Sequence, residues 1–202
     1  PSRAAEPRPD HSREVARLLE GCQPLTGTVA ETYLRSRGLE APDSPDLLFH
    51  PDLPDFDTKR GWAGMVAVVR DVAGKATGGV HRTYLLDDGS AKAPPGKKML
   101  GPIAGGALRL APLAEDGRIA VAEGIETALS AQLIFGVPTM AALSADGLRR
   151  WRWPDGTTHV TIFADAANLT NAAYVAYEGS HDKPTEVEQI GSRYMFGARF
   201  NF

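Results

Sequence analysis

The chain has 202 residues, of which 43% are hydrophobic and 23% are charged, and its formal net charge is −3. These values are typical of one good-sized soluble domain or two small ones, and they exclude a chain too polar to bury a core. The single cysteine, Cys22, excludes an internal disulfide and a cysteine-rich zinc site, and it fits a reducing compartment.

The N-terminal part predicts two helices. Residues 1–9 are rich in proline and charge and predict disorder, whereas apolar residues recur at helical spacing over 12–22. A second helix is indicated by Thr28 and Glu31, which form a capping-box pair, and by Gly38 at its C-terminal end. Residues 40–60 predict mostly loop around a short strand, LLFH. Because the chain starts at a proline, without initiator methionine or signal peptide, we interpret it as a fragment.

A β-rich section follows, with strands expected at GMVAVVRD, GGVHRTYLL and ALRLAPL. Between the last two, SAKAPPGKKMLGPIAGG predicts a long, flexible, basic loop. Residues 61–110 carry seven basic and three acidic side chains, whereas residues 1–60 and 111–166 are each −3. This basic middle is either an electrostatic footprint for a polyanion or a solvated, lysine-bearing loop.

From residue 118 the pattern alternates between strand and helix. RIAVA, TMAAL and HVTIFA predict strands, IETALSAQLIF predicts a helix closed by Gly136 and Pro138, and ADGLRRW predicts a short helix or turn. Such an order favours a parallel sheet with right-handed crossovers. Two of the strands end in carboxylates, Glu123 and Asp165, which the carboxyl edge of the sheet would bring together.

The segments AEGIETALSA and IFAD resemble a Toprim domain, the metal-binding fold of bacterial primases and topoisomerases. The resemblance implies Mg²⁺ held by Glu123 and by an Asp-x-Asp pair beginning at Asp165, with Glu123 as acid or base. Gly124 matches the residue that lets the backbone turn closely behind the glutamate. The second acid of the pair is replaced by Ala167, so we expect Mg²⁺ binding to be weak or lost and any activity to be impaired.

The preceding region, from PLTGTVAETYLRSRGL to GGALRL, resembles the part before the Toprim domain in phage and plasmid primase-like proteins. This kinship implies DNA or RNA as partner and a cytoplasmic location. It also implies an upstream zinc-ribbon and a downstream helicase, neither of which this chain contains. Arg82, Lys97 and Lys98 match basic positions that face nucleic acid in such proteins; alternatively they only solubilise a hairpin and loop.

Other interpretations of the site residues stay open. Glu123 could be a helix N-terminal acid favoured by the helix dipole, and Asp165 a polar residue at a strand end. Glu126 is expected to be a solvated acid of the first helical turn rather than a ligand. Trp151 and Trp153 predict either a stacking platform for bases or a wedge that packs a helix onto the sheet.

The tail differs from a Toprim chain. Its last residues alternate strictly, with Tyr194, Phe196 and Phe200 on one face, as in a lipid-facing barrel strand or a half-buried edge strand. NLTN, YEGS and IGSRYMFGARFNF resemble the C-terminus of TonB-dependent outer-membrane receptors, from about residue 160 onward. We therefore expect a chimeric or truncated chain, with the outer membrane as the alternative location. Two strands cannot close a barrel, so the tail must pack on the Toprim sheet or dangle.

The predicted fold is α/β. It begins with a helical and loop segment (1–60), followed by a basic, antiparallel β-rich section (61–115). A truncated Toprim-like, mainly parallel sheet with flanking helices comes next (116–166). The chain ends in a β-hairpin-like tail (167–202). The predicted function is that of a primase-like, nucleic-acid-binding fragment with an ancestral Mg²⁺-dependent nucleotidyl or phosphoryl transfer. The alternatives are a non-enzymatic nucleic-acid-binding module and a piece of an outer-membrane receptor.

Overall fold

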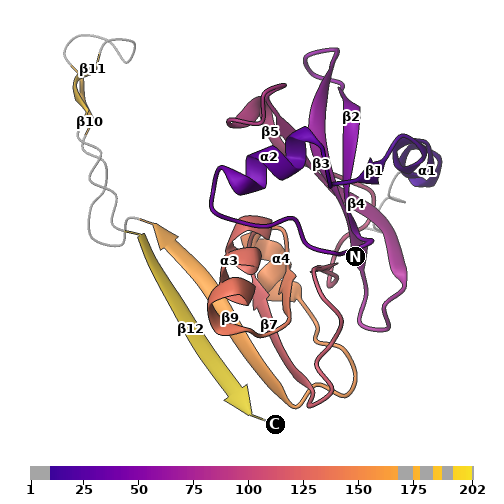
Figure 1. The fold of residues 1–202 in the computed structure, drawn as a ribbon, viewed down its shortest axis with the longest axis vertical. Coiled ribbons are helices and arrows are strands. Elements are labelled where there is room, and N and C mark those ends of the chain that lie inside the picture. Colours follow the sequence, from indigo (N-terminus) through magenta and orange to yellow (C-terminus); the bar gives the residue numbers. More distant parts are fainter. Residues whose placement is uncertain (1–9, 168–174, 178–183, 188–192, 202) are drawn as a thin grey trace, which may run out of the picture.

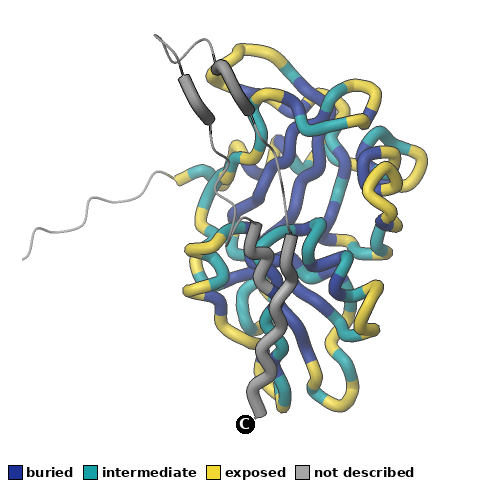
Figure 2. Tube along the Cα trace, turned by 90° about the vertical axis from the view of Figure 1, so that its left-hand side faces the viewer, coloured by how far each residue is buried: buried dark blue, intermediate teal, exposed yellow. Residues whose placement is uncertain are grey.

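The computed structural model describes residues 10–167, 175–177, 184–187 and 193–201, with side-chain positions for residues 10–163. Two sheets dominate it, an antiparallel sheet from the N-terminal half and a mixed sheet from the C-terminal half (Figure 1). Buried residues follow the strands of both sheets (Figure 2). The α/β class is therefore confirmed.

The antiparallel sheet has the strand order β1-β2-β3-β4-β5. Its strands are β1 (Gln23–Pro24), β2 (Leu47–Asp55), β3 (Arg60–Arg70), β4 (Ala76–Leu85) and β5 (Lys92–Leu100). Because successive side chains of a strand point to opposite faces, the sheet buries two apolar surfaces. Helix α1 (Ser12–Glu20) packs on one of them, which we term the outer face, and α2 (Val29–Arg35) packs on the other, the inner face.

The mixed sheet has the order β12-β9-β7-β8-β6. Its strands are β6 (Leu108–Arg109), β7 (Arg118–Ala122), β8 (Thr139–Ala141), β9 (His159–Ala167) and β12 (Arg193–Asn201), and its helices are α3 (Ile125–Phe135) and α4 (Ala145–Arg150). β7 runs parallel to both β8 and β9, which confirms the predicted parallel core of this sheet. A separate pair is formed by β10 (Val175–Tyr177) and β11 (Pro184–Val187).

One apolar cluster joins the two halves. It contains Leu34 of α2 and Met65 of β3 together with Ala122 of β7 and Leu129 of α3. The inner face of the antiparallel sheet therefore faces the helix that follows β7, and the two sheets share a core. This packing brings side chains of β4 and β5 towards the carboxyl edge of the mixed sheet.

The predicted basic loop at residues 90–106 is wrong in its first half, because Lys92–Leu100 forms β5. Pro94 and Pro95 lack the N–H groups of a central strand and led to the expectation of a loop. They are tolerated because β5 lies at the edge of its sheet, with β4 as its only neighbour in that sheet. Similarly, the short strand expected at LLFH continues to Asp55.

The capping interactions predicted from the sequence are present at the C-terminal ends of α2 and α3 but not at the N-terminal end of α2. Gly38 and Gly136 adopt the left-handed conformation, with φ of +69° and +63°, at the predicted C-terminal ends of α2 and α3. The capping box of α2 does not form. The Thr28 hydroxyl donates to the Leu25 carbonyl oxygen, and Glu31 accepts from the Gly27 N–H instead of the Thr28 N–H.

Strand β12 pairs antiparallel with β9 over nine positions, from Arg193–Ala167 to Asn201–His159. Of the two expectations for the tail, packing on the Toprim sheet is therefore the observed one. The side chains that alternate along β12, the segments NLTN and YEGS, and residues 1–9 lie outside the described positions, apart from Tyr177 in the backbone of β10. Among the described residues, no helix has the length and apolar character needed to cross a membrane.

Candidate nucleic-acid and metal site at the end of β7

Glu123 occupies the position directly after β7, at the centre of the mixed sheet, and Gly124 begins α3 as its N-cap residue. Ala122 pairs with Phe163 of the neighbouring strand β9, so Asp165 lies two residues beyond that pair. The backbone thus places both acidic residues at the carboxyl edge of adjacent parallel strands, as the sequence predicts. The side chains of Asp165 and Ala167 lie outside the described positions.

Gly124 has an extended backbone, with φ −113° and ψ 162°. A Cβ atom at this position would meet its nearest neighbours, Oγ1 of Thr127 and Oε2 of Glu126, only at 3.8 Å and 3.9 Å. The interpretation that a glycine is required for a close turn is therefore wrong, since neither the dihedral angles nor the space demand one.

Lys97 reaches this edge from the other sheet. Its Nζ atom lies 3.9 Å from the position that a Cβ atom of Gly124 would take and 3.8 Å from Oε2 of Glu126. Burial lowers the pKa of Lys97 and the ammonium of Lys92 lowers it further, whereas the carboxylates of Glu126 and Glu123 raise it. An ammonium from β5 therefore lies close to Gly124, the residue that follows the predicted catalytic glutamate.

Glu126 interacts with Lys97 and with two further residues of the N-terminal half. Its Oε1 atom accepts a hydrogen bond from the Tyr33 hydroxyl at 2.7 Å and lies 2.6 Å from Nζ of Lys92. Burial alone would raise the pKa of Glu126, but the hydrogen bond from Lys92, the charge of Lys97 and the Tyr33 hydroxyl lower it to about 2. The side chain is only 20% exposed. Glu126 is thus a first-turn acid, as predicted, but it is an interdomain ion-pair partner rather than a solvated residue.

Two buried polar side chains of β4 lie on the inner face of the antiparallel sheet. His81 and Thr83 are both buried, and His81 Nδ1 and Thr83 Oγ1 have no hydrogen-bond partner among the described residues. Burial lowers the pKa of His81 to about 4, and the charge of Lys97 acts in the same direction. His81 is therefore neutral at pH 7 and adds no positive charge beside Lys97.

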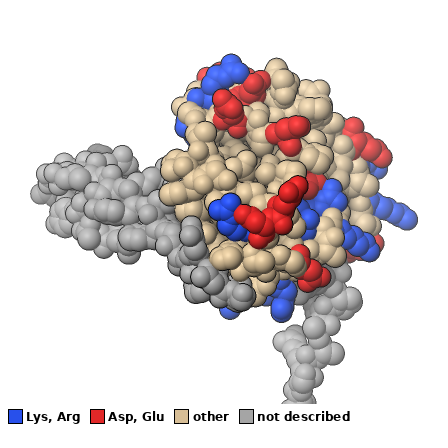
Figure 3. Space-filling view, turned by 60° about the horizontal axis from the view of Figure 1, so that its bottom comes forward, with Lys and Arg blue, Asp and Glu red and all other residues tan. Residues whose placement is uncertain are grey.

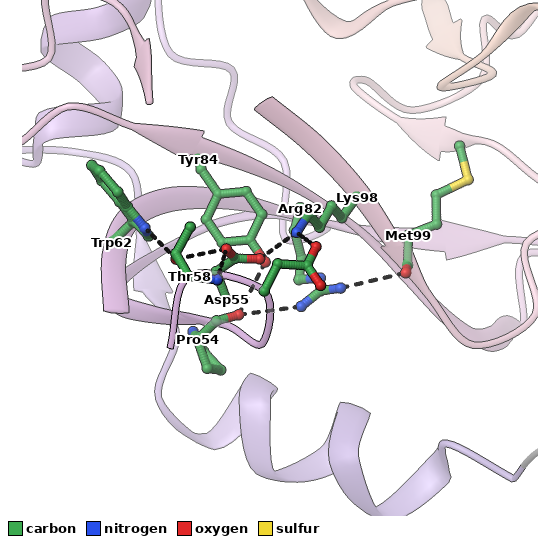
Figure 4. A network of polar contacts seen from close by, with 9 residues as sticks. Pro54, Asp55, Thr58, Trp62, Arg82, Tyr84, Lys98 and Met99 are labelled. Atoms are coloured by element: carbon green, nitrogen blue, oxygen red, sulfur yellow. Dashed lines mark hydrogen bonds and ion pairs between the residues drawn. The ribbon is translucent and has the colours of Figure 1, made fainter. Parts of the chain in front are cut away.

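Arg82 and Lys98 lie on the outer face, away from Glu123. In the register of the sheet Arg82 pairs with Lys98 and Thr83 pairs with Lys97, so the two pairs face opposite sides. Lys98 forms ion pairs with Asp55 and with Asp57 (Figure 4). The three basic residues that the sequence predicts to bind nucleic acid are therefore divided between two surfaces.

Most positive charges of residues 61–110 are engaged within the protein. Arg70 contacts Asp46 at 2.6 Å, and Lys92, Lys97 and Lys98 each contact carboxylates from other segments. On the surface drawn in Figure 3, basic and acidic side chains are interspersed instead of forming a patch of one sign. The surplus of positive charge in the sequence thus serves largely to bind acidic segments of the same chain.

The donor set does not fit a strong Mg²⁺ site. Mg²⁺ prefers several oxygen ligands in octahedral geometry. Ala167 offers none, Glu126 is occupied by Tyr33 and Lys92, and the Lys97 ammonium lies where it repels a cation. Within the part of the chain with described side chains, no three His, Cys, Asp or Glu residues form a cluster that could hold a metal ion.

The two tryptophans after α4 differ in their surroundings. Trp151 is buried in a cluster with Ile119 and Val160, which confirms a wedge that packs onto the sheet. Trp153 is 47% exposed, and its ring lies 6.5 Å from that of Trp151 in an edge-on arrangement.

Two family models match the chain in succession. Residues 9–110 match a family described as a domain of unknown function (DUF7146), and residues 118–182 match the Toprim domain. No curated protein and no solved structure matches the chain significantly. The second match confirms the Toprim resemblance of the segment from β7 to β9, and it continues beyond the boundary expected at residue 166. Because the first match covers 102 of 202 residues, the chain belongs to the DUF7146 family, and its C-terminal half carries a Toprim domain.

Proposed function

We propose that this chain is a primase-like, Toprim-type protein that binds DNA or RNA and whose ancestral reaction is Mg²⁺-dependent nucleotidyl or phosphoryl transfer. The supporting observation is the position of Lys97 near Gly124, the residue after Glu123, where a cation from the DUF7146 sheet meets the carboxyl edge of the Toprim sheet. A phosphate placed at this edge would contact residues from both halves of the chain.

The proposed roles follow from position and chemistry. Glu123 acts as acid or base and as a metal ligand, Asp165 is a second ligand, and Lys97 contacts a phosphate. Lys98 and Arg82 are assigned no phosphate contact at this edge, because they lie on the outer face. With Ala167 in place of the third carboxylate, transfer activity is weak or lost, and no catalytic step through Mg²⁺ is assigned to this chain.

Nucleic-acid binding tests the proposal directly. Fluorescence anisotropy with a labelled single-stranded oligonucleotide should show binding that weakens steeply with salt. Lys97→Ala should weaken it at least fivefold and reduce the salt slope by about one. Lys75→Ala, which removes an exposed lysine of the same basic section, is the matched control and should bind as the unmodified chain does. Binding that is absent, or unchanged by Lys97→Ala, contradicts the proposal.

A second candidate is a non-enzymatic nucleic-acid-binding module. Two observations favour it: Ala167 removes a ligand, and the Lys97 ammonium already supplies a positive charge at the edge where a metal would act. Under this proposal, binding is the same in EDTA and in Mg²⁺, and Glu123→Gln does not weaken it. If binding requires Mg²⁺ and Glu123, the enzyme-like proposal is favoured instead.

The kinship of residues 160–202 with the end of a TonB-dependent receptor is a separate proposal. The strict alternation of residues 193–201 supports it, whereas the Toprim match to residue 182 covers part of the same segment. Sequencing the genomic reading frame around codons 160–170 tests it. An uninterrupted frame in related genomes, with Toprim sequence on both sides, would exclude a chimeric origin.

A further inference from the structure

A cavity of about 510 Å³ lies on the outer face of the antiparallel sheet, the side opposite to Glu123. α1 forms one wall with Arg13, Arg17 and Leu18, and the end of β2 with the following turn forms another that includes Phe56. Arg82 and Leu100 contribute from β4 and β5. Cavities of roughly 300–1,000 Å³ are typical of small-molecule sites.

Arg82 is the unusual residue of this cavity. It is only 5% exposed, yet it forms no ion pair with a carboxylate among the described side chains, and its Nε atom has no hydrogen-bond partner there. Its terminal nitrogens donate to the carbonyl oxygens of Pro54 and Met99, both at the long distance of 3.4 Å (Figure 4). The guanidinium carbon also lies 5.8 Å from the centre of the Tyr84 ring. Buried charges in proteins are normally paired with an opposite charge, and the described part of the chain supplies none to Arg82.

Two further arginines lie at the mouth of the cavity. Arg13 and Arg17 are four residues apart on α1 and therefore share one side of the helix; both are exposed, and neither forms an ion pair among the described residues. Two acidic residues, Glu14 and Asp52, line the cavity, and Glu14 also contacts Nδ1 of His11 at 2.6 Å. Three guanidinium groups thus outnumber the carboxylates, and the cavity favours an anion.

Of the remaining lining residues, His50 is polar, and the others are apolar. Phe56 is 69% exposed, and it lines the cavity together with Pro54. Leu18 of α1 and Leu100 of β5 add aliphatic surface. An exposed aromatic ring beside a cationic pocket is a stacking partner for a flat, apolar ring system.

We infer that this cavity binds a nucleotide, with its phosphates against Arg82, Arg13 and Arg17 and its base against Phe56. The site lies across the sheet from the Toprim edge and requires neither Glu123 nor a metal ion. Guanidinium groups bind phosphate oxygens in a bidentate manner, which the long contacts of Arg82 to carbonyl oxygens leave possible.

Isothermal titration of the full chain with ADP in EDTA tests this inference. We expect a Kd below about 1 mM. The double variant Arg13→Ala/Arg17→Ala, which changes only exposed positions, should weaken binding at least tenfold. Arg35→Ala, on α2 at the other face of the sheet, is the matched control and should leave the Kd unchanged. Phe56→Ala should weaken binding of ADP but not of inorganic pyrophosphate, which lacks a base.

A second measurement addresses Arg82 itself. Arg82→Gln removes a buried charge that has no carboxylate partner among the described side chains, so the variant should fold, and ADP should no longer raise its Tm as it does for the unmodified chain. The inference is overturned if ADP does not bind at millimolar concentration, if the double variant binds as the unmodified chain does, or if Glu123→Gln abolishes ADP binding. It is also overturned if only a 5′-phosphorylated oligonucleotide, and not ADP, requires Arg13 and Arg17.

Discussion

The ammonium of Lys92 lies 2.6 Å from Oε1 of Glu126, so the edge strand of the DUF7146 sheet is bonded to the first turn of the Toprim helix α3. The same oxygen accepts a hydrogen bond from the hydroxyl of Tyr33, on α2, at 2.7 Å. Elements from both halves therefore meet at one carboxylate, and its other oxygen, Oε2, lies 3.8 Å from Nζ of Lys97.

Replacing Glu126 with Gln should destabilise the fold. The variant leaves two lysines without their carboxylate in a site that is mostly buried, and we expect a loss of about 2 kcal/mol in the free energy of unfolding, measured by urea denaturation. Glu115→Gln, at an exposed position, is the control and should change the value by less than about 0.5 kcal/mol. A Glu126→Gln variant as stable as the control would show that the ion pairs of Glu126 add no net stability to the fold.

Tyr33→Phe probes the same contact from the other side. Removal of the hydroxyl leaves Glu126 with one hydrogen-bond donor fewer, and we expect a cost of about 1 kcal/mol. In a double-mutant cycle with Glu126→Ala, which removes the accepting oxygen, the two effects should be coupled by at least about 0.5 kcal/mol. Strict additivity would mean that the 2.7 Å hydrogen bond contributes nothing to stability.

Acidification should destabilise the protein in two steps. Burial lowers the pKa of His81 from 6.5 to about 4, so between these values the unfolded chain binds a proton that the folded chain does not. The free energy of unfolding should therefore fall as the pH drops through this window, by up to about 1.4 kcal/mol per pH unit. The pKa of Glu126, lowered from 4.5 to about 2, adds a further loss below pH 4.5.

The variant His81→Gln separates these steps. It should flatten the pH dependence between 6.5 and 4 and leave the loss below 4.5 in place, as followed by urea unfolding at a series of pH values. Thr83→Val is the matched control, because it changes a buried, unpartnered polar group on the same face that does not titrate in this range. An unchanged slope in His81→Gln would refute the assignment of the first step to this histidine.

Local patterns predicted the part of the fold in which neighbours in sequence are neighbours in space. The alternation of RIAVA, a helix ending at Gly136 and TMAAL specified the parallel strands β7 and β8, and the acid at the end of β7 followed from it. The contact between Tyr33 and Glu126 carries no such signal, because 93 residues separate the two. The strand β5 could not be predicted from its sequence, because Pro94 and Pro95 are tolerated in a strand only when it lies at the edge of a sheet.

The division of the basic residues could have been predicted in part. In a strand, Arg82 must face away from His81 and Thr83, so GGVHRTYLL already separates its arginine from its histidine. The same rule separates Lys97 from Lys98, but it applies only once their segment is recognised as a strand. Which of the two lysines faces Glu123 depends on the packing of one sheet against the other, and no local pattern encodes that packing.

Gly124 and Gly136, at the two ends of α3, should respond differently to alanine. Gly124→Ala should cost less than about 1 kcal/mol, the cost of a poorer N-cap residue, because the backbone is extended and the nearest atom to a new Cβ is 3.8 Å away. Gly136→Ala should cost about 1 kcal/mol or more, because φ is +63°. Thermal unfolding of both variants provides the comparison, and equal stabilities would contradict the backbone geometry described for the two ends of the helix.

Ala167→Asp should recover metal binding. Position 167 is the last residue of β9, two residues after Asp165, and residues two apart on a strand share a face. The substitution therefore adds a carboxylate to the edge that holds Glu123, and we expect the Mg²⁺ affinity to rise at least tenfold in a calorimetric titration. Ala166→Asp, on the opposite face, is the matched control and should bind no better than the unmodified chain. Because Glu123 would be a ligand in the restored site, Glu123→Gln in the Ala167→Asp background should remove the gain. Equal Mg²⁺ affinity in Ala167→Asp and Ala166→Asp would contradict the prediction that position 167 completes a metal site with Glu123 and Asp165.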